Sequence, residues 1–593
     1  MTTPTASDLV SFVVKVDGNA IPGSYQVQAI TVEQAINRIA TAVLTILDGD
    51  TAAEDFTVSA SETFVPGKAI SIELGYDNTN VLVFSGIVTS QALSFEPDTG
   101  PRLEVGCHDK AVAMTIGRKS KAWSKAKDSD AITSLISTAG LSAKVEATKT
   151  ELPELVQYYT SDWDFMIARA EVNGLVVAAT NGSVNVIDPG KPKAAVLTAE
   201  FGSSMLGFRT ALNAATQLSQ VTARAWDYQK QAIVSAAAPN DSAGPGNLSS
   251  KTLAKVAAPA DFTLQTTAAV AKDSLSDWAK AQMKKSQLAK ITGTVRLQGT
   301  SIPTLGAFVT LAGLSDRFNG DHFVSSVQQM VTDGNWVTEI GIGMPAMRFV
   351  QEQAVVAPEA AGLLPGISGL TTATVLQIDQ DPDGEYRIKL NVPMFDDRQG
   401  LWARLANLYA TNGAGAFFLP EIGDEVIVGF LNQDPRFPII LGSLYSQKNK
   451  PFADFTPNDK NSLKGIASKS GLCLTFDDEN AILTVITPKK NKLVLDDKAG
   501  QIEMRDQNGN AITMSSSGIK IQSDKAIAIS AGQTVSVAGM TGVTVQSAGG
   551  DVVTNGVNIK ETASIEYTAK GNSTATVQGG ASLTLKAAMI MIN

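Results

Sequence analysis

The chain has 593 residues, of which 44% are hydrophobic and 18% are charged, a composition typical of a folded protein with several domains. No stretch approaches the roughly 18 consecutive apolar residues of a membrane-spanning helix. The first residues also lack the basic flank and apolar stretch of a secretory leader. The formal charge of −10 argues against a nucleic-acid partner, whose phosphates require a basic surface. We therefore expect synthesis and assembly in the cytoplasm without a signal peptide.

The N-terminal half alternates short strands, turns and a few helices. Asp128 and Ser129 predict the cap of one helix, and Ser161 predicts the cap of another. A stretch rich in Ala, Ser, Pro and Gly, 233–261, is typical of a surface loop. The elements that we expect are strands at 12–16, 42–47 and 81–84 and helices at 131–139, 163–172 and 274–288.

Cysteine and histidine are too sparse for most catalytic or metal sites. Cys107 and Cys473 lie far apart, so we interpret them as free, buried thiols rather than a disulfide framework. The two histidines, His108 and His322, form no His-x-His motif. Cys107 and His108 are neighbours on a predicted strand, so their side chains diverge and do not form a dyad. The sequence thus predicts no catalytic residue, no cofactor and no metal site, and we expect a protein that is not an enzyme.

A compact β segment follows, with strands expected at 375–378 and 386–392. Between them, Asp379 to Gly384 matches the opening of a calcium loop, but its twelfth position is Leu390 rather than Glu. We therefore interpret it as a polar turn. Asp424 and Glu425 are adjacent on a predicted strand, point to opposite faces, and cannot flank one glycosidic bond.

The C-terminal segment repeats every eight residues. Apolar-x-apolar pairs begin at Ile519 and recur at this step, and nine of ten positions in the row are apolar, Asp551 being the exception. Eight residues are too few for one chain to close its own β-helix turn. Three intertwined chains solve this, because each supplies one short strand per layer around a shared apolar axis. An ordinary meander with accidental spacing is the alternative. The predicted axis residues are Ile519, Ile527, Val535, Val543, Ile559 and Leu583.

Upstream, a looser version of the pairs steps by nine to eleven residues, at 472/474, 483/485, 493/495, 502/504 and 512/514. We interpret these as wider strands at the base of the same rod. The chain ends on Met589, Ile590, Met591 and Ile592 before Asn593. Three copies of these residues would form a blunt apolar platform, and an exposed apolar end usually carries a partner.

The middle segment closely resembles the VgrG and phage tail-spike family. The resemblance rests on Trp402 to Leu405, Gly413 to Phe430 and Asn432 to Tyr445. The N-terminal half resembles the hub portion of that family in Ile21 to Tyr25, Asp48 to Asp50, Pro66 to Lys68, Gln157 to Tyr159, Asp162 to Phe165 and Arg169 to Glu171.

The resemblance implies a mainly β protein with β-barrel hub domains, a few helices, an OB-like barrel and an intertwined trimeric β-helix rod. The expected domains are a hub with two barrel-like subdomains at 1–350, a linker at 351–370, an OB-fold barrel at 371–446, a linker at 447–461, and the spike at 462–593.

It also implies a homotrimeric hub and puncturing spike of a contractile injection machine. The expected partners are the inner tube, the baseplate, a PAAR-type tip protein that can carry effector or toxin cargo, and the target membrane on firing. A trimeric receptor-binding fibre and a cell-wall-degrading spike enzyme remain as alternatives. The sequence does not separate type VI, extracellular and phage systems.

Overall fold

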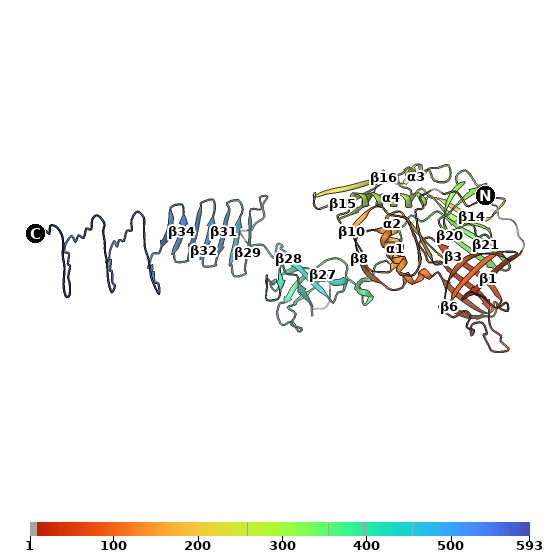
Figure 1. The fold of residues 1–593 in the computed structure, drawn as a ribbon, viewed down its shortest axis with the longest axis horizontal. Coiled ribbons are helices and arrows are strands. Elements are labelled where there is room, and N and C mark those ends of the chain that lie inside the picture. The colour runs from red at the N-terminus through yellow and green to blue at the C-terminus, as the bar shows by residue number, and fades with distance from the viewer. Residues whose placement is uncertain are drawn as a thin grey trace. The chain divides into compact units, whose positions relative to one another are not determined.

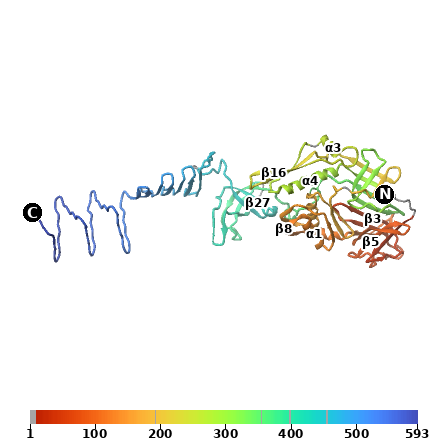
Figure 2. The same cartoon turned by 45° about the horizontal axis from the view of Figure 1, so that its top comes forward.

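Strands dominate the computed structural model, which describes residues 9–191, 193–257, 259–353, 355–393, 395, 399–452 and 455–592 (Figure 1, Figure 2). The mainly β fold is therefore confirmed. Residues 1–8, on which the expectation about a leader partly rests, lie outside the described residues, as does Asn593. The chain forms two compact units, one up to Ser443 and one from Leu444 onward.

The largest sheet of the first unit joins segments that are far apart in the sequence. Its central contact pairs β3 (Val27–Ala35) with β20 (Gly320–Thr332), from Ser326 opposite Ala35 to Thr332 opposite Ala29. One apolar cluster surrounds Phe64 and a second surrounds Val295, while the division of 1–350 into two barrel-like subdomains stays a prediction. In sheet order the strands are β14 (Met205–Leu212), β18 (Ile291–Gln298), β21 (Asn335–Ile342), β20 (Gly320–Thr332), β3 (Val27–Ala35), β4 (Thr41–Leu47), β7 (Gly100–His108), β6 (Thr79–Glu96), β5 (Ala69–Tyr76), β1 (Val10–Val16) and β2 (Asn19–Ala20), with β13 (Leu197–Glu200) and β19 (Phe308–Ala312) attached beside β20.

Helices and small sheets cover the rest of this unit. Helix α2 (Asp162–Val172) has the predicted cap, since Ser161 Oγ accepts the N–H of Asp164, and Gly174 follows its end in the left-handed region. Helix α1 starts earlier than predicted, at Asp128, because that carboxylate lies inside the first turn and accepts from Arg169 and Asn173 rather than capping the helix. The other elements are η1 (Lys110–Thr115), α1 (Asp128–Thr138), α4 (Lys272–Leu288), the pair β8 (Lys119–Lys127) and β10 (Glu151–Thr160), the sheet β11 (Val176–Thr180), β12 (Ser183–Ile187) and β9 (Ser142–Val145), and the sheet β16 (Ala232–Pro239), β15 (Gln220–Asp227) and β17 (Phe262–Thr266).

The predicted loop at 233–261 is wrong over about half of its length, at 233–239 and 250–257. Strand β16 pairs with β15 throughout, and α3 (Ser250–Ala257) follows. The alternating Val234, Ala236 and Ala238 face helix α4. The small side chains that made the segment resemble a loop instead allow the helix to pack closely on the sheet.

The middle segment is a closed five-stranded barrel. Its core contains Val375, Leu390 and Val428. The turn at Gly423 precedes β27 as predicted, with Gly423 at φ 91°. Around the barrel the strands are β22 (Thr371–Gln377), β23 (Ile388–Asn391), β24 (Leu401–Leu405), β28 (Pro438–Ser443) and β27 (Glu425–Phe430), and α5 (Phe349–Glu352), η2 (Glu359–Gly362) and η3 (Leu431–Gln433) lie in the flanking segments.

The second unit is a ladder of seven short antiparallel strands, each paired with the next (Figure 1). Beyond it, the described residues 523–592 contain no helix or strand, and the trace runs back and forth in repeated bends. The strands are β29 (Leu463–Ala467), β30 (Cys473–Asp477), β31 (Ile482–Ile486), β32 (Lys492–Asp496), β33 (Gln501–Arg505), β34 (Ala511–Ser515) and β35 (Gly518–Gln522).

Candidate assembly interface

One face of the seven-stranded ladder carries two columns of apolar side chains. At each step the register places an apolar residue opposite the apolar residue of the next strand, as Val485 lies opposite both Leu474 and Leu493. The first column is Ile466, Leu474, Val485, Leu493, Met504, Ile512 and Ile521, and the second is Phe476, Leu483, Leu495, Ile502, Met514 and Ile519.

Four of the five looser pairs therefore lie where the sequence predicts. The pair at 472/474 is wrong, because Leu472 precedes β30 and the residues that join the columns are Leu474 and Phe476. The hairpin register decides this: Leu474 faces Val485 and Phe476 faces Leu483, so the pair starts two residues later.

The opposite face of the ladder is mostly polar, although Ile482, Ile486 and Val494 also lie there. Residues such as Thr484, Glu503 and Thr513 alternate with the apolar positions and point the other way. The first column, from Val485 to Ile521, lines a groove of about 550 Å³ that also includes Ile527. Large side chains in it, Met504 and Ile521 among them, stay exposed in the single chain. A continuous apolar surface of this length is typical of a surface that another chain covers.

The eight-residue repeat continues from the columns, because Ile519 and Ile521 belong to both. Five of its first positions, Ile527, Val535, Val543, Ile559 and Leu583, are between 52% and 54% exposed, whereas Tyr567 is 65% exposed. Five of its second positions, Ile529, Val537, Val545, Val553 and Val577, are between 72% and 75% exposed, whereas Leu585 is 63% exposed. The sequence period is thus a structural period. Whether these residues line an axis shared by three chains stays a prediction.

A row of small residues has the same period. Four residues after each first position stands a small residue, and the chain bends there. A Cβ added at Gly539, Gly571 or Gly579 would lie 2.2 to 2.3 Å from the carbonyl oxygen three residues further on. The complete row is Ser523, Ala531, Gly539, Ser547, Asn555, Ala563, Gly571, Gly579 and Ala587.

Carboxylates interrupt the apolar positions in the middle of the repeat. Asp551 occupies a first position and Glu561 a second position. Tyr567, at the first position of the next repeat after Glu561, donates its hydroxyl to Glu561 Oε2 at 2.7 Å. This hydrogen bond raises the pKa of Tyr567. At the end of the chain, Met589 to Ile592 are all exposed, and their role as a partner platform stays a prediction.

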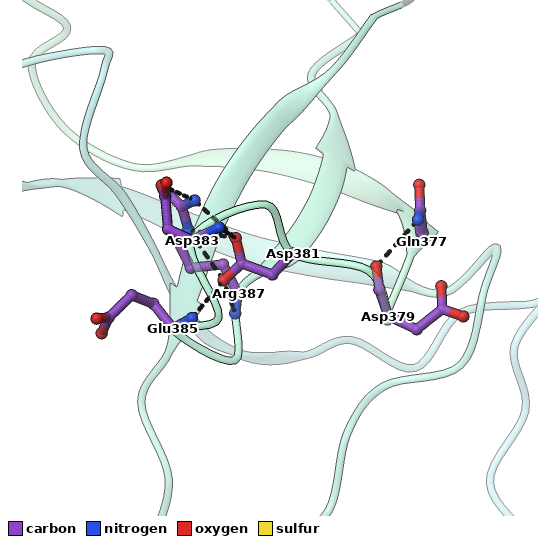
Figure 3. A network of polar contacts seen from close by, with 6 residues as sticks. All are labelled: Gln377, Asp379, Asp381, Asp383, Glu385 and Arg387. Atoms are coloured by element: carbon purple, nitrogen blue, oxygen red, sulfur yellow. Dashed lines mark hydrogen bonds and ion pairs between the residues drawn. The ribbon is translucent and has the colours of Figure 1, made fainter.

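In the acidic turn before β23, groups of the protein itself bind the carboxylates (Figure 3). Arg387 Nη2 lies 2.6 Å from Asp381 Oδ1 and also contacts Asp383. The backbone N–H groups of Glu385 and Arg387 donate to Asp381 Oδ2. These contacts, with the guanidinium first, lower the pKa of Asp381. The turn interpretation is therefore confirmed by its own contacts, which occupy both carboxylate oxygens of Asp381.

The remaining candidates for chemistry have structural partners. Cys107 and Cys473 are free and buried, as predicted, and burial raises the pKa of Cys107 to about 12. His108 Nδ1 lies 2.7 Å from Thr89 Oγ1, whereas Cys107 Sγ lies near the carbonyl of Val105. Within the described residues, no group of three or more His, Cys, Asp or Glu side chains is placed to hold a metal ion. No helix there is long and apolar enough to cross a membrane.

The barrel and the ladder define the class of protein: a spike and hub of the phage-baseplate type. Residues 371–445 match the type VI secretion system/phage-baseplate injector OB domain, and residues 483–549 match the phage baseplate V C-terminal trimerisation domain. Residues 6–333, just over half of the chain, match the Alg8 N-terminal domain. The chain belongs to the family of that domain and is a VgrG-type spike protein, so the predicted resemblance is confirmed.

Characterised relatives share only part of their length with this chain. The type VI secretion system spike protein VgrG1a of Pseudomonas aeruginosa is 27% identical over 202 residues, 31% of each chain. VgrG4b of the same organism is 30% identical over 116 residues, 18% of this chain and 14% of its own. A VgrG1 of Vibrio cholerae described as an actin cross-linking toxin is 34% identical over 99 residues, but only 9% of its length is matched. The matched regions thus span less than a third of these relatives.

Two solved structures of tail and type VI secretion proteins are similar to this chain, with low sequence identity. An E. coli component of the type VI secretion system has 12% identity and a TM-score of 0.39, with 73% of this chain and 99% of that one covered. A tail protein of the Shewanella oneidensis prophage MuSo2 has 11% identity and a TM-score of 0.44, with 57% and 99% covered.

Proposed function

We propose that this chain is the homotrimeric central spike and hub of a contractile injection machine. The single observation that supports this most strongly is the two-column apolar face that runs along the ladder and continues into the repeat. A single copy leaves those side chains in water, and its repeat has no strand partners in residues 523–592. Three copies around one axis would bury the columns and supply the missing backbone partners.

The mechanism is force transmission rather than catalysis. The hub is seated on the inner tube and baseplate, and contraction of the sheath drives the rod through a target membrane. Stiffness arises because every layer of the rod is bonded to its neighbours, as in other repeat architectures. The relatives are described mostly as spike proteins, which fits a chain that does no chemistry of its own.

The tip residues Met589 to Ile592 carry a PAAR-type cone in this proposal, and the cone can bring effector cargo. The chain is made in the cytoplasm and leaves the cell as part of the particle. Met591→Asp should abolish co-purification of a co-expressed PAAR-type protein while the spike keeps its native mass. Undiminished co-purification would contradict the platform.

The native mass of the full-length chain, measured by light scattering on a sizing column, tests the trimer. We expect three times 62.2 kDa. Two substitutions one residue apart provide the control. Leu495→Asp places a carboxylate on the apolar face and should abolish the trimer, whereas Val494→Asp, on the opposite face, should leave it intact. A stable monomer, or equal effects of the two substitutions, would overturn the proposal.

A further inference from the structure

An arm of the barrel extends between strands β24 and β27. Its base is bonded to the barrel, because the N–H of Ala406 donates to the carbonyl of Ile440, but its hairpin pairs only with itself. It covers Asn407 to Phe418 and contains a small hairpin, β25 (Ala410–Thr411) with β26 (Ala414–Gly415). The pair forms its own two-stranded sheet and is not part of the closed barrel. Strands of two residues do not hold a hairpin in water unaided, so the arm needs a surface to rest on.

The composition of the arm is that of an interface. Residues 407–418 contain no Asp, Glu, Lys or Arg, although charged residues make up 18% of the chain. Leu408 is 97% exposed, Phe417 70% and Phe418 67%. Solvated loops are usually polar, and large aromatic side chains in an uncharged setting are typical of the buried centre of an interface.

A matching apolar surface lies on the outside of the same barrel. Val428 and Ile440 of β27 and β28 point into the core, so the residues that alternate with them face outward. Gly429 stands between two leucines, because a Cβ added there would lie 3.3 Å from Leu370 Cδ2 and 3.8 Å from Leu441 Cδ1. Both leucines are at least half exposed. We call Leu370, Ile427, Gly429, Ile439 and Leu441 the barrel patch.

We propose that the arm of one copy docks on the barrel patch of the next copy around the three-fold axis. The inference rests on the proposed trimer. In the single chain Phe417 and Phe418 of the arm and Leu370 and Leu441 of the patch are at least half exposed, so the arm does not cover these leucines of its own patch. Every copy carries one arm and one patch, and such a head-to-tail contact closes into a ring when it follows a rotation axis. The segment that matches a trimerisation domain follows in the same chain. Six residues of the extended hairpin reach about 20 Å.

A photo-cross-linking residue in the arm tests this directly. Benzoylphenylalanine replaces Phe418 in the full-length chain, and after irradiation the linked peptides are identified by mass spectrometry. We expect cross-links between chains, with the acceptor in the peptides that contain Leu370 or 427–441. The same residue at Tyr386, which is 82% exposed on the same barrel outside arm and patch, should give no link to those peptides.

A substitution in the barrel patch provides a second test. Leu441→Lys, which places a charge on the patch without touching the barrel core, should lower the cross-link yield from position 418 at least about tenfold. Tyr386→Lys should leave the yield unchanged. Mixing tagged and untagged chains separates links between chains from links within one chain.

The native mass of each sample distinguishes the two ways of failing. A trimer whose position 418 links only to its own chain, or outside the patch, overturns this inference and leaves the trimer standing. A monomer overturns the inference together with the proposed function.

Discussion

Lys290 shows how one buried side chain holds a loop of the hub. Its Nζ donates to three carbonyl oxygens, those of Ala243 at 2.7 Å, Pro245 at 2.5 Å and Leu248 at 2.9 Å. The residue is 1% exposed, and burial lowers its pKa to about 8. The ammonium therefore connects the start of β18 to the segment between β16 and α3.

Lys290→Met should destabilise the hub by about 2–4 kcal/mol, because it leaves three carbonyls without this donor. The measurement is the urea midpoint of the hub transition. Lys280→Met, at an exposed position of α4, should change it by less than about 0.5 kcal/mol. Equal effects of the two substitutions would show that the three contacts contribute nothing.

His322 makes the hub sensitive to acid. It is 2% exposed and its Nε2–H donates to the carbonyl of Phe318. Burial lowers its pKa below the ordinary 6.5, and Lys290 acts in the same direction while Asp321 opposes it. Since the folded state binds the proton less tightly than the unfolded state, the free energy of unfolding falls as pH drops through 6.5 and below.

His322→Gln keeps a donor for Phe318 and removes the titration. The variant should lose less stability than the parent between pH 7 and pH 5, as measured by urea unfolding at each pH. Identical pH profiles would mean that other groups carry the acid sensitivity.

The repeat is the element on which the rod depends. Val535→Asp together with Val543→Asp would bury three unpaired carboxylates per layer in the trimer. We expect no stable rod, while the hub still folds, and circular dichroism with native mass measures both. A double variant that melts and assembles like the parent would show that the axial assignment is wrong.

Glu561 is a native carboxylate at one of the apolar positions of the repeat, so its removal should have the opposite effect. Glu561→Leu should stabilise the rod by about 1–4 kcal/mol, since buried charges are often worse than apolar side chains of similar size. Glu566→Leu, at a position outside the two apolar rows, is the matched control. A lower rod melting temperature for Glu561→Leu would mean that the carboxylate and Tyr567 stabilise the assembly instead.

Two compact units in one chain should unfold in two steps. The first unit contains its own apolar clusters, whereas the second buries little within one copy. We therefore expect the rod transition to shift to higher temperature as protein concentration rises, because trimer formation stabilises it by mass action, and the hub transition to stay fixed. Calorimetry over a hundredfold concentration range measures this. A single transition independent of concentration would contradict the division.

Local patterns predicted the elements whose signals are local. The cap at Ser161 predicted α2, and the alternation of apolar and polar residues predicted four of the five ladder pairs. Pairing between segments far apart in the sequence could not be predicted. The pairing of β3 with β20 joins segments about 295 residues apart, as the contact between Glu33 and Gln328 shows, and β16 was mistaken for a loop because its partner α4 lies further along the chain.

The sequence by itself determined the mainly β class, the family and the period of the rod, because a strict repeat and continuous motifs fix which residues share a face. Only the tertiary structure decided that the apolar pairs align in two unbroken columns, that Phe476 rather than Leu472 joins them, and that Arg387 occupies the acidic turn. The physical reason is that hairpin register and side-chain contacts are set by packing between strands, and a one-dimensional pattern does not specify which strand lies opposite which.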